Sequence, residues 1–391
     1  MNKFELLLIE SLMKSRIECP EKLVVMALQG ISVNRQKYHD RWLNSALKRL
    51  NHFEGSNGFE SLDEFIQLTY DDAVKADIPF EDFIRLIDVY RIECLENTSV
   101  EPENASFFAP EFAIDRLCFI LEGCYFNENG TPVLNGILKR FKKKHAIGLL
   151  LLLIHDVPNG VKVDKSLRIS NITRLELSYL GLEEIPYLDK LFNLSILNCS
   201  CNEITELNLV ANKKLLVLDC SENHLQYLDV RENRRLEMLI CDENHLSHLN
   251  LYNNKELVHL SCSSNEIMEL NISENPELIS IICFCNELNE LNTTENKFIE
   301  FIDCAYNYIE DLDVTKNVNL EGLSVEGNSL NSLNLKSNKL LTSLNIIDNE
   351  ISEIDTSQNS LLTDIKKYKK CKNTIKQNKI HIKPRKYIIY E

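Results

Sequence analysis

The sequence predicts an α/β repeat protein, in which a solenoid with a parallel β-sheet on its concave face follows an all-α domain. Two periodicities predict this architecture: apolar residues near the start recur with a helical period, and asparagine later recurs every 21 residues in two series. We place the helical domain at residues 1–157, the repeat solenoid at 158–365 and a basic C-terminal cap or tail at 366–391.

The helical domain is predicted from apolar spacing and helix-start signals. Apolar residues in 4–12 and in 42–50 recur three or four positions apart, which places them on one helix face. Ser61 and Glu64 have the spacing of a capping box. The helix-forming residues 137–155 predict a last long helix. This part of the chain resembles no known family, so its role is left open.

The solenoid is predicted from three residue series in the same register. Asparagine supplies two of them and cysteine the third, and a shared period over eight copies indicates stacked repeats of one supersecondary unit. The first asparagine series is Asn202, Asn223, Asn244, Asn265, Asn286, Asn307, Asn328 and Asn349. The second is Asn212, Asn233, Asn254, Asn275, Asn296, Asn317, Asn338 and Asn359. The cysteine series is Cys199, Cys220, Cys241, Cys262, Cys283 and Cys304, continued by Val325 and Ile346.

One repeat shows the pattern of the whole array. Residues 215–230 read L-x-x-L-x-C-x-x-N-x-L-x-x-L-D-V, which resembles the leucine-rich repeat family and within it a bacterial class with a nested 21-residue repeat. The resemblance covers about half of the chain. It implies a protein-binding module that uses its concave face, in a bacterial effector or an intracellular sensor.

The physics of a stacked coil explains the repeated residues. The segment Leu218 to Cys220 is expected to be a strand with alternate residues inward, and stacking pairs such strands at about 4.8 Å. Backbone groups in the turn after the strand point inward without a strand partner. An inward asparagine amide can satisfy them and bridge to the neighbouring coil, which explains why asparagine recurs at this position.

The thirteen cysteines are expected to be reduced thiols. Their number is odd, and no secretory leader precedes them. Each member of the cysteine series occupies an inward strand position, where a small apolar side chain fits. Structural zinc ligands come in clusters with short spacings, so we expect no metal and no cofactor in this ladder.

Binding is favoured over catalysis, because the chain has no P-loop, G-x-G-x-x-G, H-E-x-x-H or G-x-S-x-G motif. An enzyme or toxin activity in the helical domain, with the repeats selecting the target, stays open as an alternative. Its candidates are Cys94, Cys118, His39 and His145, because a nucleophile and its base are neighbours in space rather than in sequence.

The candidate partner-binding residues are those that should face outward from the sheet. Large apolar side chains on an exposed face mark contact surfaces, and carboxylates beside them would select a partner with basic side chains. The apolar candidates are Met238, Ile240, Ile282, Phe284, Phe301 and Tyr306. The acidic candidates are Asp219, Asp242, Glu243 and Asp303.

Charge is strongly polarised along the chain. The formal net charge is −16, residues 191–365 carry 29 acidic and 10 basic residues, and the tail 366–391 carries nine Lys, one Arg and one Glu. We expect a protein partner rather than nucleic acid, since phosphate contacts need a net basic surface. Binding of nucleic acid or an anionic surface by the tail is a further alternative. The sequence does not set the oligomeric state.

No membrane span is expected. The longest apolar run, 146–154, rises about 14 Å as a helix, which is less than half of the roughly 30 Å hydrocarbon core. The N-terminus lacks the apolar run of a signal peptide. These features predict a cytoplasmic protein, and they are compatible with delivery into a host cell.

Overall fold

The computed structural model describes residues 120–155 and 160–367, together with positions 70, 71, 74, 75, 118, 157, 372 and 373. These residues fall in two compact units, one within 1–127 and 132–169 and the other within 128–131 and 170–391. Most of the predicted helical domain, and most of the basic tail, lie outside the described residues.

The first unit contains helices and one hairpin. Strands β1 (Tyr125–Phe126) and β2 (Pro132–Val133) pair antiparallel, which differs from the all-α prediction for this part of the chain. The turn between them holds Gly130 at φ 78°, a conformation that glycine adopts readily. The 3-10 helix η3 (Gly136–Arg140) leads to α7 (Lys143–His155), and the short 3-10 helix η4 (Lys165–Leu167) follows. A further 3-10 helix, η5 (Ile169–Asn171), contains the last residue of this unit and the first two of the next chain segment.

Helix α7 holds the longest apolar run, and all of residues 146–154 are buried in it. This agrees with a core helix. Among the described residues, no helix has the length and apolar character needed to cross a membrane.

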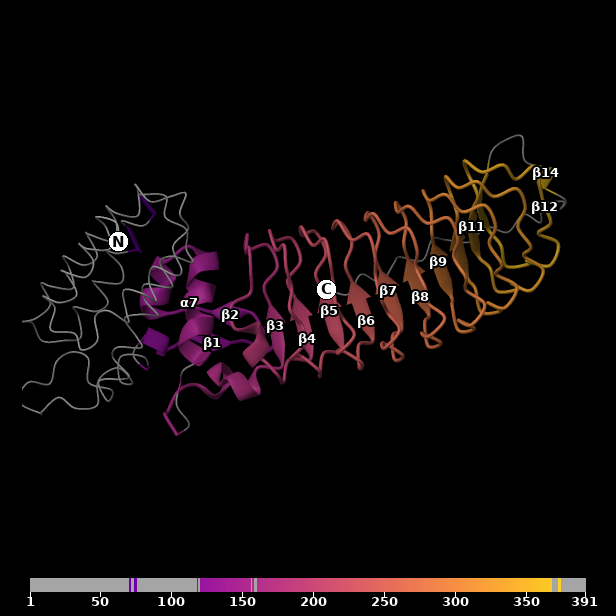
Figure 1. Ribbon diagram of the computed structural model, residues 1–391. Helices are drawn as coiled ribbons and strands as arrows, with labels where there is room; N and C mark the ends of the chain where they lie inside the picture. Colours follow the sequence, from indigo (N-terminus) through magenta and orange to yellow (C-terminus); the bar gives the residue numbers. More distant parts are fainter. Residues whose placement is uncertain are drawn as a thin grey trace, which may run out of the picture. The chain divides into compact units, whose positions relative to one another are not determined.

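The second unit is a stack of coils around one parallel sheet (Figure 1). The order β13-β11-β10-β9-β8-β7-β6-β5-β4-β3 follows the chain, so each coil adds one strand beside the last. The predicted leucine-rich repeat solenoid is confirmed. Its strands are β3 (Arg174–Glu176), β4 (Ile196–Asn198), β5 (Val217–Asp219), β6 (Met238–Ile240), β7 (His259–Ser261), β8 (Ser280–Ile282), β9 (Phe301–Asp303), β10 (Gly322–Ser324), β11 (Ser343–Asn345) and β13 (Asp364–Lys366).

Two smaller features complete this unit. The 3-10 helix η6 (Leu188–Lys190) lies in an early coil, and β12 (Glu353–Ile354) pairs parallel with β14 (Lys372–Asn373) in a second, two-stranded sheet. The first residues of the basic tail therefore contribute strand pairing at the end of the array. The role of residues 374–391 as a cap stays a prediction.

Every coil has the same inside and outside. The middle residue of each strand from β3 to β11 is at most 2% exposed, as are the ladder cysteines, while most first and third residues are half-buried. Coils pair at identical positions, for example Leu218 with Leu239. The strand period of two therefore assigns one residue per strand to the core and two to the sheet surface.

The first asparagine series bridges coils as expected. Asn265 Oδ1 accepts from the backbone N–H of Leu246 in the preceding coil at 2.9 Å. Its Nδ2 donates to the carbonyls of Cys241, Cys262 and Ser263 at 3.0–3.2 Å. One amide thus satisfies four backbone groups in two coils.

The residue before each of these asparagines has a left-handed backbone conformation. Glu222, Glu243, Ser264 and Cys285 have φ between 50° and 52°, and the same conformation recurs along the array. Only Gly327 meets this requirement with glycine among the repeats of the asparagine series, at φ 67°. The turn is therefore fixed by the inward asparagine rather than by a flexible residue.

Candidate functional site

The first and third residues of strands β3 to β13 form one surface, which we call the sheet face. Its members lie in register, so each position forms a row across neighbouring coils. The predicted binding residues lie on this face or in the turn that follows each strand. Their exposure agrees with outward placement, because none of the ten is buried.

The predicted apolar strip is interrupted. Met238 and Ile240 lie on β6, whereas Ile282 and Phe301 lie on β8 and β9. Strand β7 separates the two groups and presents His259 and Ser261 at the corresponding positions. The structure therefore divides the predicted strip into a β6 pair and a second group, which we call the aromatic cluster. The aromatic cluster comprises Ile282, Phe284, Phe301 and Tyr306.

Two glycines of the next coil make room for the rings of the aromatic cluster. A Cβ atom added to Gly322 would lie 2.6 Å from Cδ2 of Phe301, and one added to Gly327 would lie 2.6 Å from Cδ1 of Tyr306. Neither distance is possible without moving the ring, so both rings lean across onto glycine backbone. Neither glycine is among the residues predicted from the sequence, although a glycine inside a strand is a recognised sign of close approach.

Hydrogen bonds hold Tyr306 in the same direction. Its hydroxyl donates to Oε1 of Glu326 at 2.6 Å, and Asn345 Nδ2 donates to Oε2 of the same carboxylate at 2.5 Å. These bonds to the charged form lower the pKa of Glu326, and the bond to Glu326 raises the pKa of Tyr306. Tyr306 remains 50% exposed, so its ring is fixed in place and still accessible.

Two of the predicted carboxylates close turns. Oδ1 of Asp219 accepts from the backbone N–H and the hydroxyl of Ser221, and Oδ1 of Asp303 accepts from the N–H of Ala305. Each therefore fixes the turn that follows its strand. Burial raises the pKa of Asp303. The side chain is half-buried, so part of it is exposed at the sheet face.

Asp242 is held by hydrogen bonds to the next coil and is not a free carboxylate at the edge of the sheet face. Both of its oxygens accept from the Ser261 hydroxyl at 2.7 Å, and Oδ1 also accepts from the N–H of Ser263. Burial is the largest influence on this carboxyl and raises its pKa. Its neighbour Glu243 is exposed and in the left-handed conformation. Of this pair, Glu243 is the side chain available to a partner.

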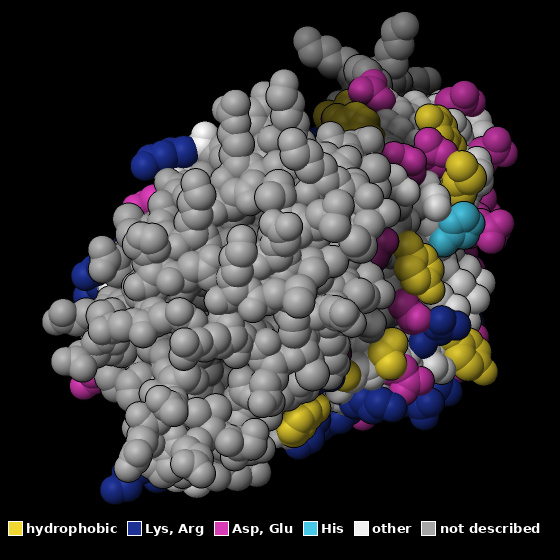
Figure 2. Space-filling model, turned by 60° about the vertical axis from the view of Figure 1, so that its left-hand side comes forward, with side chains coloured by type: hydrophobic (Ala, Val, Ile, Leu, Met, Phe, Trp, Pro, Cys, Tyr) yellow, Lys and Arg dark blue, Asp and Glu magenta, His cyan; other side chains and the backbone are white. Residues whose placement is uncertain are grey.

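Between its two ends, the sheet face has no Lys or Arg and two carboxylates, Asp219 and Asp303. The first and third positions of strands β4 to β11 contain no Lys or Arg; Arg174 on β3 and Lys366 on β13 are at the two ends. In Figure 2, the acidic side chains of the described residues gather toward one part of the visible surface, and Lys and Arg gather along another.

The ladder cysteines are buried and unreactive. Cys199, Cys220 and Cys262 are 0% exposed, and burial raises the pKa of each thiol. A thiol that stays protonated is neither a nucleophile nor a metal ligand. Cys285 lies outside the ladder and is exposed. Within the described part of the chain, no three His, Cys, Asp or Glu side chains are grouped as a metal site would require.

The candidates of the enzyme alternative are only partly described. Cys94 and His39 lie outside the described residues. Cys118 is half-buried, and His145 Nδ1 lies 2.8 Å from the hydroxyl of Tyr70. Burial lowers the pKa of His145 to about 4, so its ring is neutral at physiological pH. The contact with Tyr70 is also explained by folding alone, because the Tyr70 hydroxyl accepts a hydrogen bond from the backbone N–H of Lys142.

Comparisons with known proteins find similar proteins among solved structures. No protein-family model and no curated protein matches the chain. Among solved structures, the functional domain of InlJ from Listeria monocytogenes, which includes a cysteine ladder, has 24% identity over 58% of this chain and a TM-score of 0.38. A leucine-rich repeat protein from Leptospira interrogans has 22% identity over 53% of this chain and a TM-score of 0.49. YopM from Yersinia enterocolitica has 24% identity over 51% and a TM-score of 0.40.

The similar regions cover 59%, 56% and 51% of those three proteins, in the same order. Identities this low carry over no activity or partner from any of them. The function is therefore argued from the residues of this chain.

Proposed function

We propose that the sheet face binds a protein partner with basic side chains, and that the aromatic cluster is the centre of this interface. The observation that carries the proposal is the way in which Phe301 and Tyr306 are held. Both rings lie against glycine backbone of the next coil, outside a core that is already filled by the middle strand residues.

Fixed aromatic side chains suit a binding centre. They offer large contact area and lose little freedom on binding, and interface energy concentrates on a few such anchors. The neighbouring carboxylates Asp303, on the strand of Phe301, and Glu326, bonded to Tyr306, favour an approaching partner with Lys or Arg side chains, which can also stack on aromatic faces. Within this proposal, the role of a bacterial effector or intracellular sensor rests on the resemblance of the repeats.

The proposal is tested by capture with matched variants. Immobilised full-length protein is incubated with a lysate, and captured proteins are compared between wild type, Phe284→Ala/Phe301→Ala and Tyr308→Ala. Tyr308 is 60% exposed but lies outside the sheet face, so it controls for loss of any exposed ring. The proposal expects a protein that is retained by the Tyr308 variant and lost by the double variant. A set of captured proteins that is identical for all three chains would contradict it.

The enzyme alternative has its own test. Replacement of Cys118 or His145 should abolish an activity toward the captured protein without changing capture, if the N-terminal region acts on what the repeats select. Capture without any chemical change in the partner would instead leave binding as the function.

A further inference from the structure

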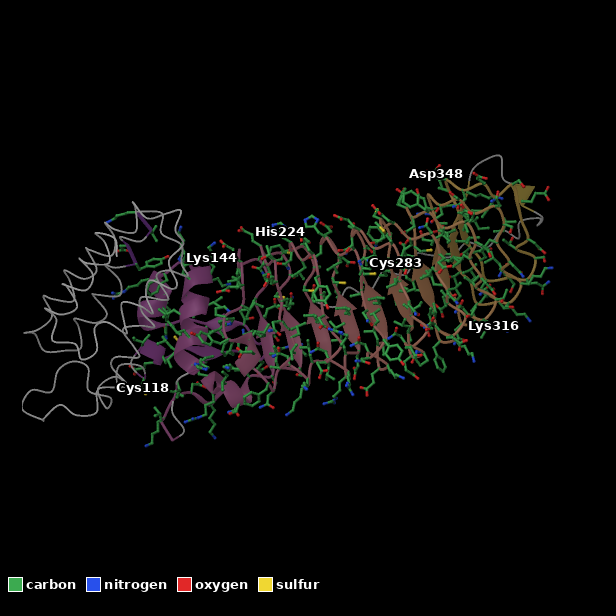
Figure 3. All side chains as sticks on the ribbon, in the orientation of Figure 1. Cys118, Lys144, His224, Cys283, Lys316 and Asp348 are labelled. Atoms are coloured by element: carbon green, nitrogen blue, oxygen red, sulfur yellow. The ribbon has the colours of Figure 1, made fainter. Side chains whose placement is uncertain are left out.

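All cations of residues 191–365 lie on one edge of the repeat array. We define the basic edge as the residues within two positions of each second-series asparagine, from 210–214 to 357–361. All ten Lys and Arg of residues 191–365 lie in these windows, whereas only five of the 29 carboxylates do. In Figure 3, Lys316 marks this edge, and His224 and Asp348 mark the opposite edge, where the strands end.

The basic edge also exposes large apolar side chains. Phe298, Val318, Leu340 and Leu361 lie in four consecutive coils and are 43–52% exposed. Val210 and Tyr252 take similar places in earlier coils, at 52% and 62%. The coil interior behind them is filled by buried leucines and asparagines, so these side chains have no place to fold inward.

Most cations on the edge are available to a ligand. Lys213, Arg231 and Lys255 each form an ion pair with a neighbouring carboxylate. The other seven form no ion pair with a described residue. They are Lys214, Arg234, Arg235, Lys297, Lys316, Lys336 and Lys339.

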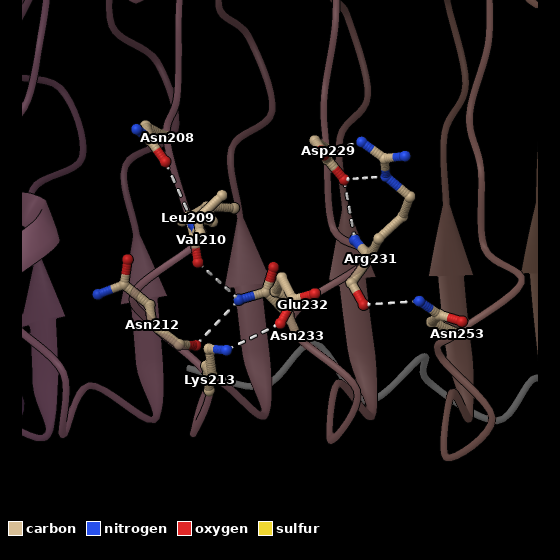
Figure 4. Close-up of polar contacts among 10 residues, drawn as sticks. All are labelled: Asn208, Leu209, Val210, Asn212, Lys213, Asp229, Arg231, Glu232, Asn233 and Asn253. Atoms are coloured by element: carbon tan, nitrogen blue, oxygen red, sulfur yellow. Dashed lines mark hydrogen bonds and ion pairs between the residues drawn. The ribbon is translucent and has the colours of Figure 1, made fainter.

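The backbone under the edge is rigid. Asn233 Nδ2 donates to the carbonyls of Leu209 and Asn212, and Asn253 Nδ2 donates to that of Arg231, each at 2.9–3.1 Å (Figure 4). These bonds join successive coils, which are stacked at about 4.8 Å. Seven of the eight windows therefore present a cation, a large apolar side chain or both along a fixed row roughly 35 Å long, and window 273–277 has neither.

We propose that the basic edge docks on an anionic phospholipid surface. Alternating Lys or Arg and large apolar side chains satisfy a bilayer interface, where apolar tips enter the acyl boundary and cations meet phosphate and carboxylate headgroups. A row of turns projects outward and so matches a broad, deformable surface. The acidic remainder of the solenoid does not prevent this approach, since salt screens charge beyond about 8 Å. The proposal is independent of the sheet face, which stays open to a protein partner.

The test measures flotation of the full-length protein with vesicles. One vesicle is phosphatidylcholine alone, and the other is equal parts phosphatidylcholine and phosphatidylserine. We expect binding to the anionic vesicle only, with a decrease as salt is raised. Arg234→Glu/Arg235→Glu and Phe298→Ser/Leu340→Ser should each weaken it by at least about tenfold, since cations and buried apolar groups both contribute.

Tyr308→Ser is the matched control, because Tyr308 is 60% exposed but lies on the opposite edge. It should bind vesicles within about twofold of wild type, since it adds no contact to the lipid. Wild-type protein that does not float with the anionic vesicle would overturn the proposal. So would edge variants that float as well as wild type, which would assign the binding to the basic residues 366–391. Unchanged thermal unfolding of each variant shows that the edge, not the fold, was altered.

Discussion

The two asparagine series have the same period but not the same bonding. In the first series both ends of the amide are used: Asn265 accepts one backbone hydrogen bond and donates to three carbonyls. In the second series only the donor end is used. Asn275 Nδ2 donates to the carbonyls of Leu251 and Asn254, whereas its Oδ1 is buried without a partner among the described residues.

One coil is an exception to this difference. Asn317 Oδ1 accepts from the hydroxyl of Thr293 at 2.8 Å, at a position where the other coils have Leu, Ile or Val, except for Thr356 in the last coil. Seven other amide oxygens of the second series have no such donor. The second turn therefore requires asparagine as a hydrogen-bond donor through Nδ2. Its buried Oδ1 has no partner in the described part of the chain, which destabilises the fold, except in the one coil where Thr293 donates to it. The first turn requires asparagine both as a donor through Nδ2 and as an acceptor through Oδ1.

The largest expected effect comes from removing a first-series amide. Asn265→Ala leaves the buried N–H of Leu246 without a partner, which costs about 1–3 kcal/mol, and it removes one of two hydrogen bonds at each of three carbonyls, so we expect a loss of at least about 2 kcal/mol in the free energy of unfolding. Asn275→Ala removes only two bonds and should cost about half as much. Urea unfolding of both variants measures this. Equal losses would contradict the distinction between the series.

A smaller loss is expected when the exceptional coil is made like the others. Thr293→Val removes the donor to Asn317 and keeps the shape of the side chain, so the free energy of unfolding should fall by about 1 kcal/mol. The same denaturation experiment measures it. A variant that is as stable as wild type would show that the hydroxyl contributes nothing to Asn317.

The reverse substitution sharpens the comparison. Val314 stands before Asn338 as Thr293 stands before Asn317, and Asn338 Oδ1 has no partner among the described residues. Val314→Thr should therefore change stability by less than about 0.5 kcal/mol, because the new hydrogen bond offsets burial of the hydroxyl. The control is Val325→Thr on the cysteine ladder, where no free amide oxygen of this kind is near. It should cost about 1–2 kcal/mol, and equal costs for the two would refute the account.

The smallest effect concerns a carboxylate that acts only as an acceptor. Burial raises the pKa of Asp242 in the folded protein, so its contribution to stability is present below the unfolded pKa of about 3.9 and is lost as pH rises through the folded pKa. Asp242→Asn removes this dependence. The variant should gain on wild type as pH rises from 4 to 7, in urea unfolding at both values. A variant whose free energy of unfolding falls relative to wild type over that range would contradict the raised pKa.

The repeat architecture could be predicted because its period, its strand alternation and its inward asparagines repeat the same physical requirement in each coil. The aromatic cluster was only partly predictable. The outward placement of Phe301 follows from alternation, but the rings lean on Gly322 and Gly327, and this depends on side-chain packing between coils. The position of Asp242 under the hydroxyl of Ser261 likewise depends on contacts between coils.

The basic edge shows the opposite case. Its residues are visible in the sequence, but their segregation appears only when the coils are superposed on the second asparagine series. Charge summed along the chain hides it, since the 29 carboxylates of residues 191–365 outnumber the ten cations.

The central claim is that the aromatic cluster is a binding surface and not core. Its most direct test is one double variant, Phe284→Ala/Phe301→Ala, measured for both unfolding and affinity toward the captured partner. We predict an affinity at least about 30-fold weaker, equivalent to roughly 2 kcal/mol, with a free energy of unfolding within about 1 kcal/mol of wild type. A double variant that binds normally but unfolds early would contradict the account, because the rings would then be part of the core.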